Sequence, residues 1–284
     1  MVVHVEGIRE AASRSSLSRS PVCVHASLRS FGYVQGGART IIDGLLAEDC
    51  TVLAPTFSWE FSVPPPHHLR PMRNGTNYDL GAMSARGVER VFSPESSEVD
   101  RAQMGAIPAA ILAMEGHVRG NHPLNSFTAV GLLAHRLING QEPLDVYRPL
   151  EVLAELGGWI VLMGVDLTSM TALHLAEKLA GRSLFRRWAN KPDGRVMMVE
   201  TGGCSDGFGN FASILAPITR QMQVGQSRWR ILPTKNTLER AVQAIQQESW
   251  ITRCGRPDCA RCKDAVQGGP VLGHENDEPQ IHER

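Results

Sequence analysis

Apolar and polar positions along the chain follow two alternating periods, which predicts strands alternating with helices. Short apolar runs rich in β-branched residues predict strands over residues 21–26, 51–57, 126–130, 159–165, 195–201 and 229–232. Apolar residues at helical spacing predict helices over residues 5–19, 36–48, 102–114, 149–156, 168–180, 208–222 and 238–249. This order indicates an α/β fold with a parallel or mixed sheet.

Two segments lack either period. Residues 58–80 hold four prolines and two histidines, which predicts a long irregular loop of the kind that often carries function. From Gln267 onward the sequence is polar and aperiodic, so we expect a disordered tail at residues 267–284. The remaining residues, 1–266, are then expected to form a single domain.

Composition narrows the class of protein. The chain has 29 basic and 29 acidic residues, and this zero net charge argues against a dedicated nucleic-acid binder. The most apolar window, residues 159–165, is too short to cross a bilayer, so no membrane partner is expected. Residues 1–20 are dense in Ser and Arg and do not resemble a secretory signal, so we expect a cytoplasmic protein.

Polar side chains follow four of the predicted strands. In open α/β sheets, ligands bind outside the carboxyl ends of the strands, so these residues are candidates for a site. Loops are polar in any protein, however, and the pattern alone does not separate the two explanations. The residues concerned are His25 and Ser27, Thr56 and Glu60, Asp166 and Thr168, and Glu200.

The loop over residues 27–40 is a candidate phosphate site. It contains Arg29 and Arg39, and Gly36 and Gly37 open the next predicted helix. Glycines let a backbone approach a ligand closely, and a helix N-terminus favours anions. The loop has neither a Walker A nor a GxGxxG pattern, and a glycine turn with surface arginines remains the alternative.

His174 is the candidate general base. It lies on an apolar helix, with Glu177 three residues after it and Thr171 three residues before it on the same face. A neutral histidine beside a carboxylate or hydroxyl is suited to accepting a proton near pH 7. The alternative is a core histidine whose ring nitrogens are satisfied within the fold.

A second histidine, His122, precedes Pro123 and is therefore expected in extended backbone. The sequence leaves open whether it contacts a ligand or braces its loop.

Six cysteines are present, and they fall into two groups. Cys23 and Cys50 lie in apolar stretches and are expected to be buried thiols. Cys254, Cys259 and Cys262 have a spacing close to that of zinc ligands, which favours structural zinc over free thiols. Cys204 is the expected fourth ligand, with Asp206 or Asp258 as oxygen alternatives.

Six stretches of the chain together resemble one family, the aminoglycoside 3-N-acetyltransferases. They occur in the family's order and cover about residues 21–215. The stretches are VHASLRSFGYVQGGARTIIDGLL, LAPTF, MGAIPAAIL, RGNHPLNSFTAVG, PLEVLAELGGWIVLMGV and TSMTALHLAE.

The resemblance implies an α/β/α sandwich around a central mixed sheet, unrelated to the GNAT acetyltransferase fold. It implies direct acetyl transfer from acetyl-CoA to an amine, through a ternary complex and without an acyl-enzyme. The partners would be acetyl-CoA and a small-molecule amine, and a homodimer is compatible with the family.

The resemblance also assigns roles to residues. His174 would take the proton of the attacking amine, with Glu177 orienting it and Thr171 on the same face. Glu200 would anchor a substrate ammonium, with Glu60 and Asp166 as further acids on the acceptor side. The residues expected to contact the cofactor are His25, Ala26, Ser27, Leu28, Arg29, Gly36, His122, Ser126 and Phe127.

The acceptor stays open at this point. The chain departs from common family patterns at Gly120, Arg148 and Thr168, and it lacks the acidic excess that suits a polycationic drug. The alternatives are an N-acyltransferase for another amine, in natural-product or metabolite chemistry, and a zinc-stabilised binding module without catalysis. A hydrolase using Cys204 and His174 is disfavoured, because metal binding explains that cysteine better.

Overall fold

The computed structural model of the chain describes residues 2–76, 78 and 90–272. Its centre is a seven-stranded mixed sheet of order β11-β12-β8-β2-β4-β7-β6. Strands β8, β2 and β4 are parallel, and the strands outside them pair antiparallel. The bounds are β2 Pro21–Ala26, β4 Thr51–Pro55, β6 Val118–Arg119, β7 Phe127–Val130, β8 Trp159–Met163, β11 Arg220–Val224 and β12 Ser227–Pro233.

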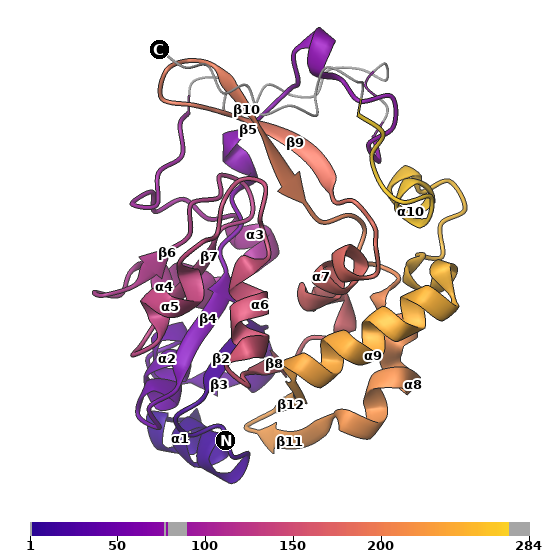
Figure 1. Cartoon of the computed structure of the whole chain (residues 1–284). Helices are drawn as coiled ribbons and strands as arrows, with labels where there is room; N and C mark the ends of the chain where they lie inside the picture. Colours follow the sequence, from indigo (N-terminus) through magenta and orange to yellow (C-terminus); the bar gives the residue numbers. More distant parts are fainter. Residues whose placement is uncertain (1, 77, 79–89, 273–284) are drawn as a thin grey trace.

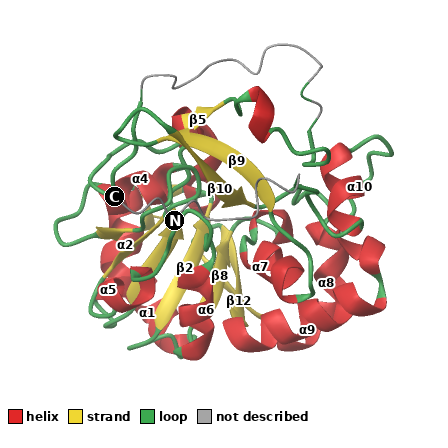
Figure 2. Cartoon of the chain, turned by 45° about the horizontal axis from the view of Figure 1, so that its top comes forward, coloured by secondary structure: helices red, strands yellow, loops and turns green. Residues whose placement is uncertain are grey.

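Helices cover both faces of this sheet, which gives the α/β/α sandwich (Figures 1 and 2). One face carries α1 Val5–Arg14, α2 Ala38–Leu46 and α4 Ala106–Leu112. The other carries α5 Ala134–Ile138, α6 Arg148–Glu155, α7 Ala172–Leu179, α8 Ala212–Leu215 and α9 Thr234–Gln247.

The alternation of side chains along the central strands divides the core into two layers. In β8, Ile160 and Leu162 pack under the α7 and α9 layer. The intervening Val161 and Met163 pack under α1 and α2. Because both faces are covered, the strand is apolar at every position, as a buried parallel strand requires.

A second, antiparallel sheet of order β10-β9-β5 lies beyond the carboxyl ends of the parallel strands (Figure 1). Its strands are β5 Ser62–Val63, β9 Phe185–Asn190 and β10 Val196–Thr201. Strand β9 was not predicted, and β5 falls in the segment that was predicted to be irregular. The two-residue strands β1 Val2–Val3 and β3 Tyr33–Val34 pair with each other, and short helices α3 Arg101–Met104 and α10 Ala260–Val266 complete the elements.

The predicted helix over residues 208–222 was wrong in its second half. Short helical turns occupy residues 208–218, and the chain then enters the edge strand β11. Pro217 lies in the last of these turns, where it lacks the N–H that a continuing helix needs. The helix predicted over residues 102–114 is likewise divided, at Gly105 with a φ of +79°.

Residues 267–271 differ from the expected disordered tail because Arg73 holds them. Its guanidinium donates to the Gly269 carbonyl at 2.9 Å, and to the side-chain and backbone oxygens of Gln267 at 2.7 and 2.9 Å. The Val271 N–H donates back to the Arg73 carbonyl. Residues 273–284, the rest of that predicted tail, lie outside the described residues.

Within the described ranges, no helix has both the length and the hydropathy to span a bilayer.

Trp229 of β12 tests the packing of the α1 and α2 layer. Its ring is fully buried and meets Phe31 edge to face, with 6.2 Å between centroids. We expect Trp229→Ala to lower the free energy of unfolding by about 3–5 kcal/mol, because it leaves a large cavity in the core. Urea denaturation followed by circular dichroism measures this change.

The matched control is Trp250→Ala. This ring is 48% exposed and its described ring contact is the Arg253 guanidinium at 4.9 Å, so we expect a loss of about 1 kcal/mol or less. Equal losses in the two variants would contradict the assigned core.

Candidate functional site

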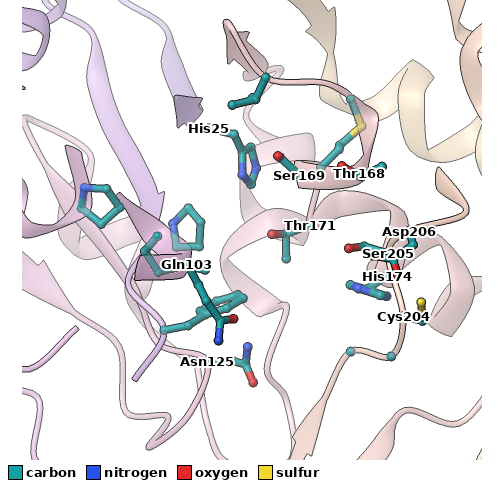
Figure 3. A pocket seen from close by; sticks show the side chains of 18 of the residues that line it. His25, Gln103, Asn125, Thr168, Ser169, Thr171, His174, Cys204, Ser205 and Asp206 are labelled. Atoms are coloured by element: carbon teal, nitrogen blue, oxygen red, sulfur yellow. The ribbon is translucent and has the colours of Figure 1, made fainter. Parts of the chain in front are cut away.

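A cavity of about 360 Å³ opens at the carboxyl ends of the parallel strands, a size typical of small-molecule sites. Its lining comes from the ends of β2 and β4, from the segment between β8 and α7, and from residues 202–206 after β10. The polar residues of the lining surround it from several elements (Figure 3). Those labelled in Figure 3 are His25, Gln103, Asn125, Thr168, Ser169, Thr171, His174, Cys204, Ser205 and Asp206, and Tyr147 and Arg261 also line the cavity.

His174 is connected to two buried charges behind the cavity. It is the third residue of α7, and its Nδ1 lies 2.8 Å from Glu177 Oε2. The other carboxylate oxygen of Glu177 accepts a hydrogen bond from Arg182 Nη1 at 2.7 Å. An ionised carboxylate only accepts, so Nδ1 is the donor and Nε2 keeps its lone pair. Among the described residues, no hydrogen-bond partner occupies Nε2.

The rings around His174 fix its orientation. Tyr147 lies parallel to it at 6.3 Å between centroids, and Phe208 meets it edge to face at 4.7 Å. A Cβ on Gly202 would lie 2.5 Å from His174 Cδ2 and 2.5 Å from the Tyr147 hydroxyl. A side chain at position 202 would therefore collide with the histidine, and glycine is the residue that allows this approach.

Thr171 also lines the cavity, as expected. It lies immediately before α7, and its carbonyl accepts the N–H of His174 at 3.0 Å. Thr171 and His174, which the helix spacing placed on one face, both line the cavity. Glu177, on the same face, contacts His174 Nδ1 but does not line the cavity.

On the opposite side, the end of β2 places His25 and Ala26 in the lining. Burial lowers the pKa of His25 to about 4, so its ring is neutral at pH 7. Its Nε2 lies 3.7 Å from the buried thiol of Cys23.

Four other residues expected at the cofactor do not line this cavity: Ser27, Leu28, Arg29 and Gly36. The Ser27 N–H donates a hydrogen bond to the Met163 carbonyl, and Arg29 is exposed on the turn that follows. Gly36 lies further along this loop, with a φ of +82°. They occupy the loop beyond β2, outside the lining.

His122 braces the fold rather than lining the cavity. Its Nε2 donates to the Glu200 carbonyl at 2.8 Å, and its Nδ1 accepts the N–H groups of Leu124 and Asn125. The ring is fully buried, and burial lowers its pKa to about 4. Both ring nitrogens are used internally, which differs from the expected cofactor contact, and the bracing positions Asn125 in the lining.

Ser126 and Phe127 are also buried away from the cavity. Ser126 Oγ donates to the Thr56 carbonyl at 3.0 Å and accepts from Arg119 Nε at 2.9 Å. Phe127 packs edge to face on Phe57 with 5.8 Å between centroids. Both differ from the expected cofactor contact, because β7 turns them into the core.

Glu200 differs from the expected anchor for a substrate ammonium. Its carboxylate is buried between two cations, with Arg186 at 3.0 Å and Lys178 at 3.2 Å. It does not line the cavity. A carboxylate already paired with two cations has little left to offer a third.

The other two predicted acids also lie outside the lining. Glu60 pairs with Arg90 on the surface. Asp166 is exposed and accepts the Thr168 N–H at 2.9 Å, which caps a 3₁₀ turn.

Six polar residues of the lining were not predicted from the sequence: Gln103, Asn125, Tyr147, Ser169, Ser205 and Arg261. Asn125 lies within the H-P-x-x-S-F stretch, which was the signal that could have identified it. Asp206, expected only as an alternative metal ligand, also lines the cavity and pairs with Arg256 at 2.8 Å.

The four cysteines beside the cavity converge as the spacing predicted. The sulfur atoms of Cys204, Cys254, Cys259 and Cys262 all lie within 4.8 Å of one another. Tetrahedral zinc, with Zn–S bonds of about 2.3 Å, places its sulfur ligands about 3.8 Å apart. The spacing therefore fits a small distortion of a zinc tetrathiolate site.

Local contacts shift the thiol pKa values of this cluster in opposite directions. A hydrogen bond from the Arg256 backbone N–H lowers the pKa of Cys254 to about 6, whereas burial raises the pKa of Cys204 to about 11 and also raises that of Cys262. The sulfur atoms of Cys254 and Cys262 are 3.6 Å apart. Cys23 and Cys50 are buried free thiols elsewhere, as expected.

Comparison with known proteins agrees with this architecture. A curated relative, aminoglycoside N(3)-acetyltransferase VIII of Streptomyces fradiae, is 34% identical over 171 residues, covering 56% of this chain and 54% of the relative. The alignment thus spans about half the length of that relative.

Two solved structures share the fold. Aminoglycoside acetyltransferase AAC(3)-Xa superposes with a TM-score of 0.71 at 26% identity, over 87% of this chain and 93% of that one. AAC-IIIb, solved as a binary complex with CoASH, superposes with a TM-score of 0.70 at 22% identity, over 87% and 97% of the two chains.

The sequence profile described as aminoglycoside 3-N-acetyltransferase matches residues 23–246, which is well over half of the chain. This match confirms the resemblance seen in the six sequence stretches. The chain belongs to the aminoglycoside 3-N-acetyltransferase family.

Proposed function

We propose that the protein is an acetyl-CoA-dependent N-acetyltransferase with His174 as its general base. The observation that carries the proposal is the buried contact between His174 Nδ1 and Glu177 Oε2 at 2.8 Å, beside the cavity. This contact selects the tautomer whose Nε2 can accept a proton. Family membership and the CoASH complex of AAC-IIIb support acetyl-CoA as the donor.

The proposed reaction is a direct transfer. The amine nitrogen attacks the thioester carbonyl carbon, the N–C bond forms, and the C–S bond breaks to release the coenzyme A thiolate. His174 Nε2 takes the proton that the amine loses, and returns it to the thiolate sulfur or to water. Glu177 stabilises the imidazolium that forms between these steps, and Arg182 Nη1 donates a hydrogen bond to the other carboxylate oxygen of Glu177.

The two sides of the cavity divide the substrates in this proposal. The β2 side, with His25 and Ala26, would receive the thioester end of acetyl-CoA. The His25 ring is neutral at pH 7, which suits the uncharged thioester and the uncharged chain that carries it. The side formed by residues 202–206 and Asn125 would receive the amine. His174 lines the same cavity.

An aminoglycoside is the first candidate acceptor, because the relatives carry that name. One observation favours a less cationic amine as the second candidate. Within the described lining, Asp206 is the carboxylate, and it is already paired with Arg256. A polycationic acceptor would ordinarily meet several free acids.

We also propose that the cysteine cluster binds structural zinc. The four sulfurs fit the tetrahedral site described above, and four thiolates leave no open position for substrate. Zinc would therefore stabilise the fold around the cavity and take no part in the chemistry.

The base is tested by His174→Gln. We expect kcat to fall about 10²–10⁴-fold, because glutamine cannot act as a general base. Its side chain is of similar length to that of histidine and remains polar. Coenzyme A affinity, measured by isothermal titration calorimetry, should stay unchanged. The control is His135→Gln, an exposed histidine on α5. Normal turnover in the His174 variant would rule out this residue as the base.

The reaction itself is tested with the wild-type protein and acetyl-CoA. A panel of aminoglycosides, amino sugars and simple amines is assayed for release of the coenzyme A thiol and for the acetylated product by mass spectrometry. We expect at least one amine to be acetylated, and acceptors with one or two amines to compete well with polycationic ones. If coenzyme A binds but no amine is acetylated, the binding-module alternative is favoured.

The metal is tested by elemental analysis of the purified protein. We expect about one zinc per chain and protection of four thiols from a thiol reagent until a chelator is added. Protein without metal, in which these four thiols react freely, would exclude the zinc site.

A further inference from the structure

Residues 202–206 form a short segment that lies between His174 and the cysteine cluster. A Cβ on Gly202 would lie 2.5 Å from the His174 ring, and one on Gly203 would lie 2.7 Å from Phe185 of β9. Cys204, in the middle of the segment, belongs to the cluster. A shift of this segment would therefore change the space around His174. The cysteine cluster attaches the segment at Cys204, its middle residue.

The other three cysteines lie on what we call the C-terminal arm, residues 249–262. Its first turn, Ser249–Thr252, accepts two hydrogen bonds from Arg182: the Thr252 hydroxyl at 2.8 Å and the Ser249 carbonyl at 2.5 Å. Arg182 is the residue that holds Glu177. The arm thus reaches the base from behind, through Arg182 and Glu177.

The arm also reaches the cavity from the front. Arg261, between the last two cysteines, is part of the lining. Asn210, which follows the 202–206 segment, donates to the Ile251 and Arg253 carbonyls at 2.8 and 3.3 Å. Arm and segment therefore meet at the cluster, and Asn210 provides a second connection between them.

The β2 side of the cavity is held differently. Val24, His25 and Ala26 pair with residues 161–163 of β8, inside the central sheet. The main-chain ladder and the covered core fix this side without any contribution from the cluster.

We propose that zinc in the cysteine cluster sets the acceptor side of the cavity and the orientation of His174, while leaving coenzyme A binding unaffected. The proposal rests on the proposed acetyl transfer. Without the metal, no ligand bonds would tie Cys204 to the three cysteines of the arm, and the middle of the segment would be free to move relative to the arm. A displacement of about 1 Å at a reacting group can cost about 10²-fold in rate.

The experiment compares three preparations: the zinc-loaded wild type, the wild type stripped with a chelator, and Cys259→Ser. We expect the last two to lose zinc and about 10²-fold in kcat/KM for the amine, with a change in coenzyme A dissociation constant of about twofold or less. Added zinc should restore the stripped wild type. Cys259→His, which can still ligate zinc, should keep most of the activity. Lys263→Ala, at an exposed position directly after the arm, is the control.

Hydrogen exchange gives a readout that does not depend on activity. Peptides covering residues 202–207 and 249–262 should exchange faster after zinc removal, while peptides covering β2 and β8 should not. Equal exchange with and without zinc, or an unchanged kcat/KM in zinc-free protein, would overturn the proposal. Loss of coenzyme A binding together with faster exchange everywhere would also overturn it, because the metal would then support the whole fold.

If the wild type acetylates no amine, the proposed function fails, and the exchange pattern still decides whether zinc sets this side of the cavity.

Discussion

The site depends on one buried interaction, the placement of the Glu177 carboxylate between His174 and Arg182. All three side chains are nearly inaccessible to solvent, so the carboxylate has lost its hydration and needs both partners. Removing one member of such a buried pair typically costs about 3–5 kcal/mol, because the other charge is left alone. Arg182, which donates to Glu177, also donates to the Thr252 hydroxyl and so connects α7 to the turn at residues 249–252.

Much of the fold could be predicted because its central strands depend on local pattern. Strand β8 is a continuous apolar run, and β2 and β4 are apolar apart from His25 and Thr51. A short apolar run rich in β-branched residues and covered on both faces is typical of a buried parallel strand. The relation between His174 and Glu177 could be predicted for a similar reason. Residues three apart on a helix share a face whatever surrounds them. Cys204 was identified as the fourth ligand because, beside Cys254, Cys259 and Cys262, the chain has only two other cysteines, and both lie in apolar stretches.

What could not be predicted depends on contacts between distant parts of the chain. Strand β9 was missed because two arginines interrupt its pattern, and Arg186 pairs with Glu200 on the neighbouring strand β10. Glu200 was expected to face a substrate, because the sequence does not show that Lys178 reaches it from α7. Arg182 had no visible role, since its partner Thr252 lies 70 residues away.

We propose that His174 presents an unprotonated Nε2 to the cavity because Glu177 accepts the Nδ1–H hydrogen bond. Nitrogen-15 NMR of protein labelled at histidine measures this tautomer directly, with a His174→Gln sample to assign the signal. We expect a protonated Nδ1 and an unprotonated Nε2 in the resting protein at neutral pH. A proton on Nε2 with Nδ1 bare would contradict it, because that ring could not accept the proton of an attacking amine from the cavity side.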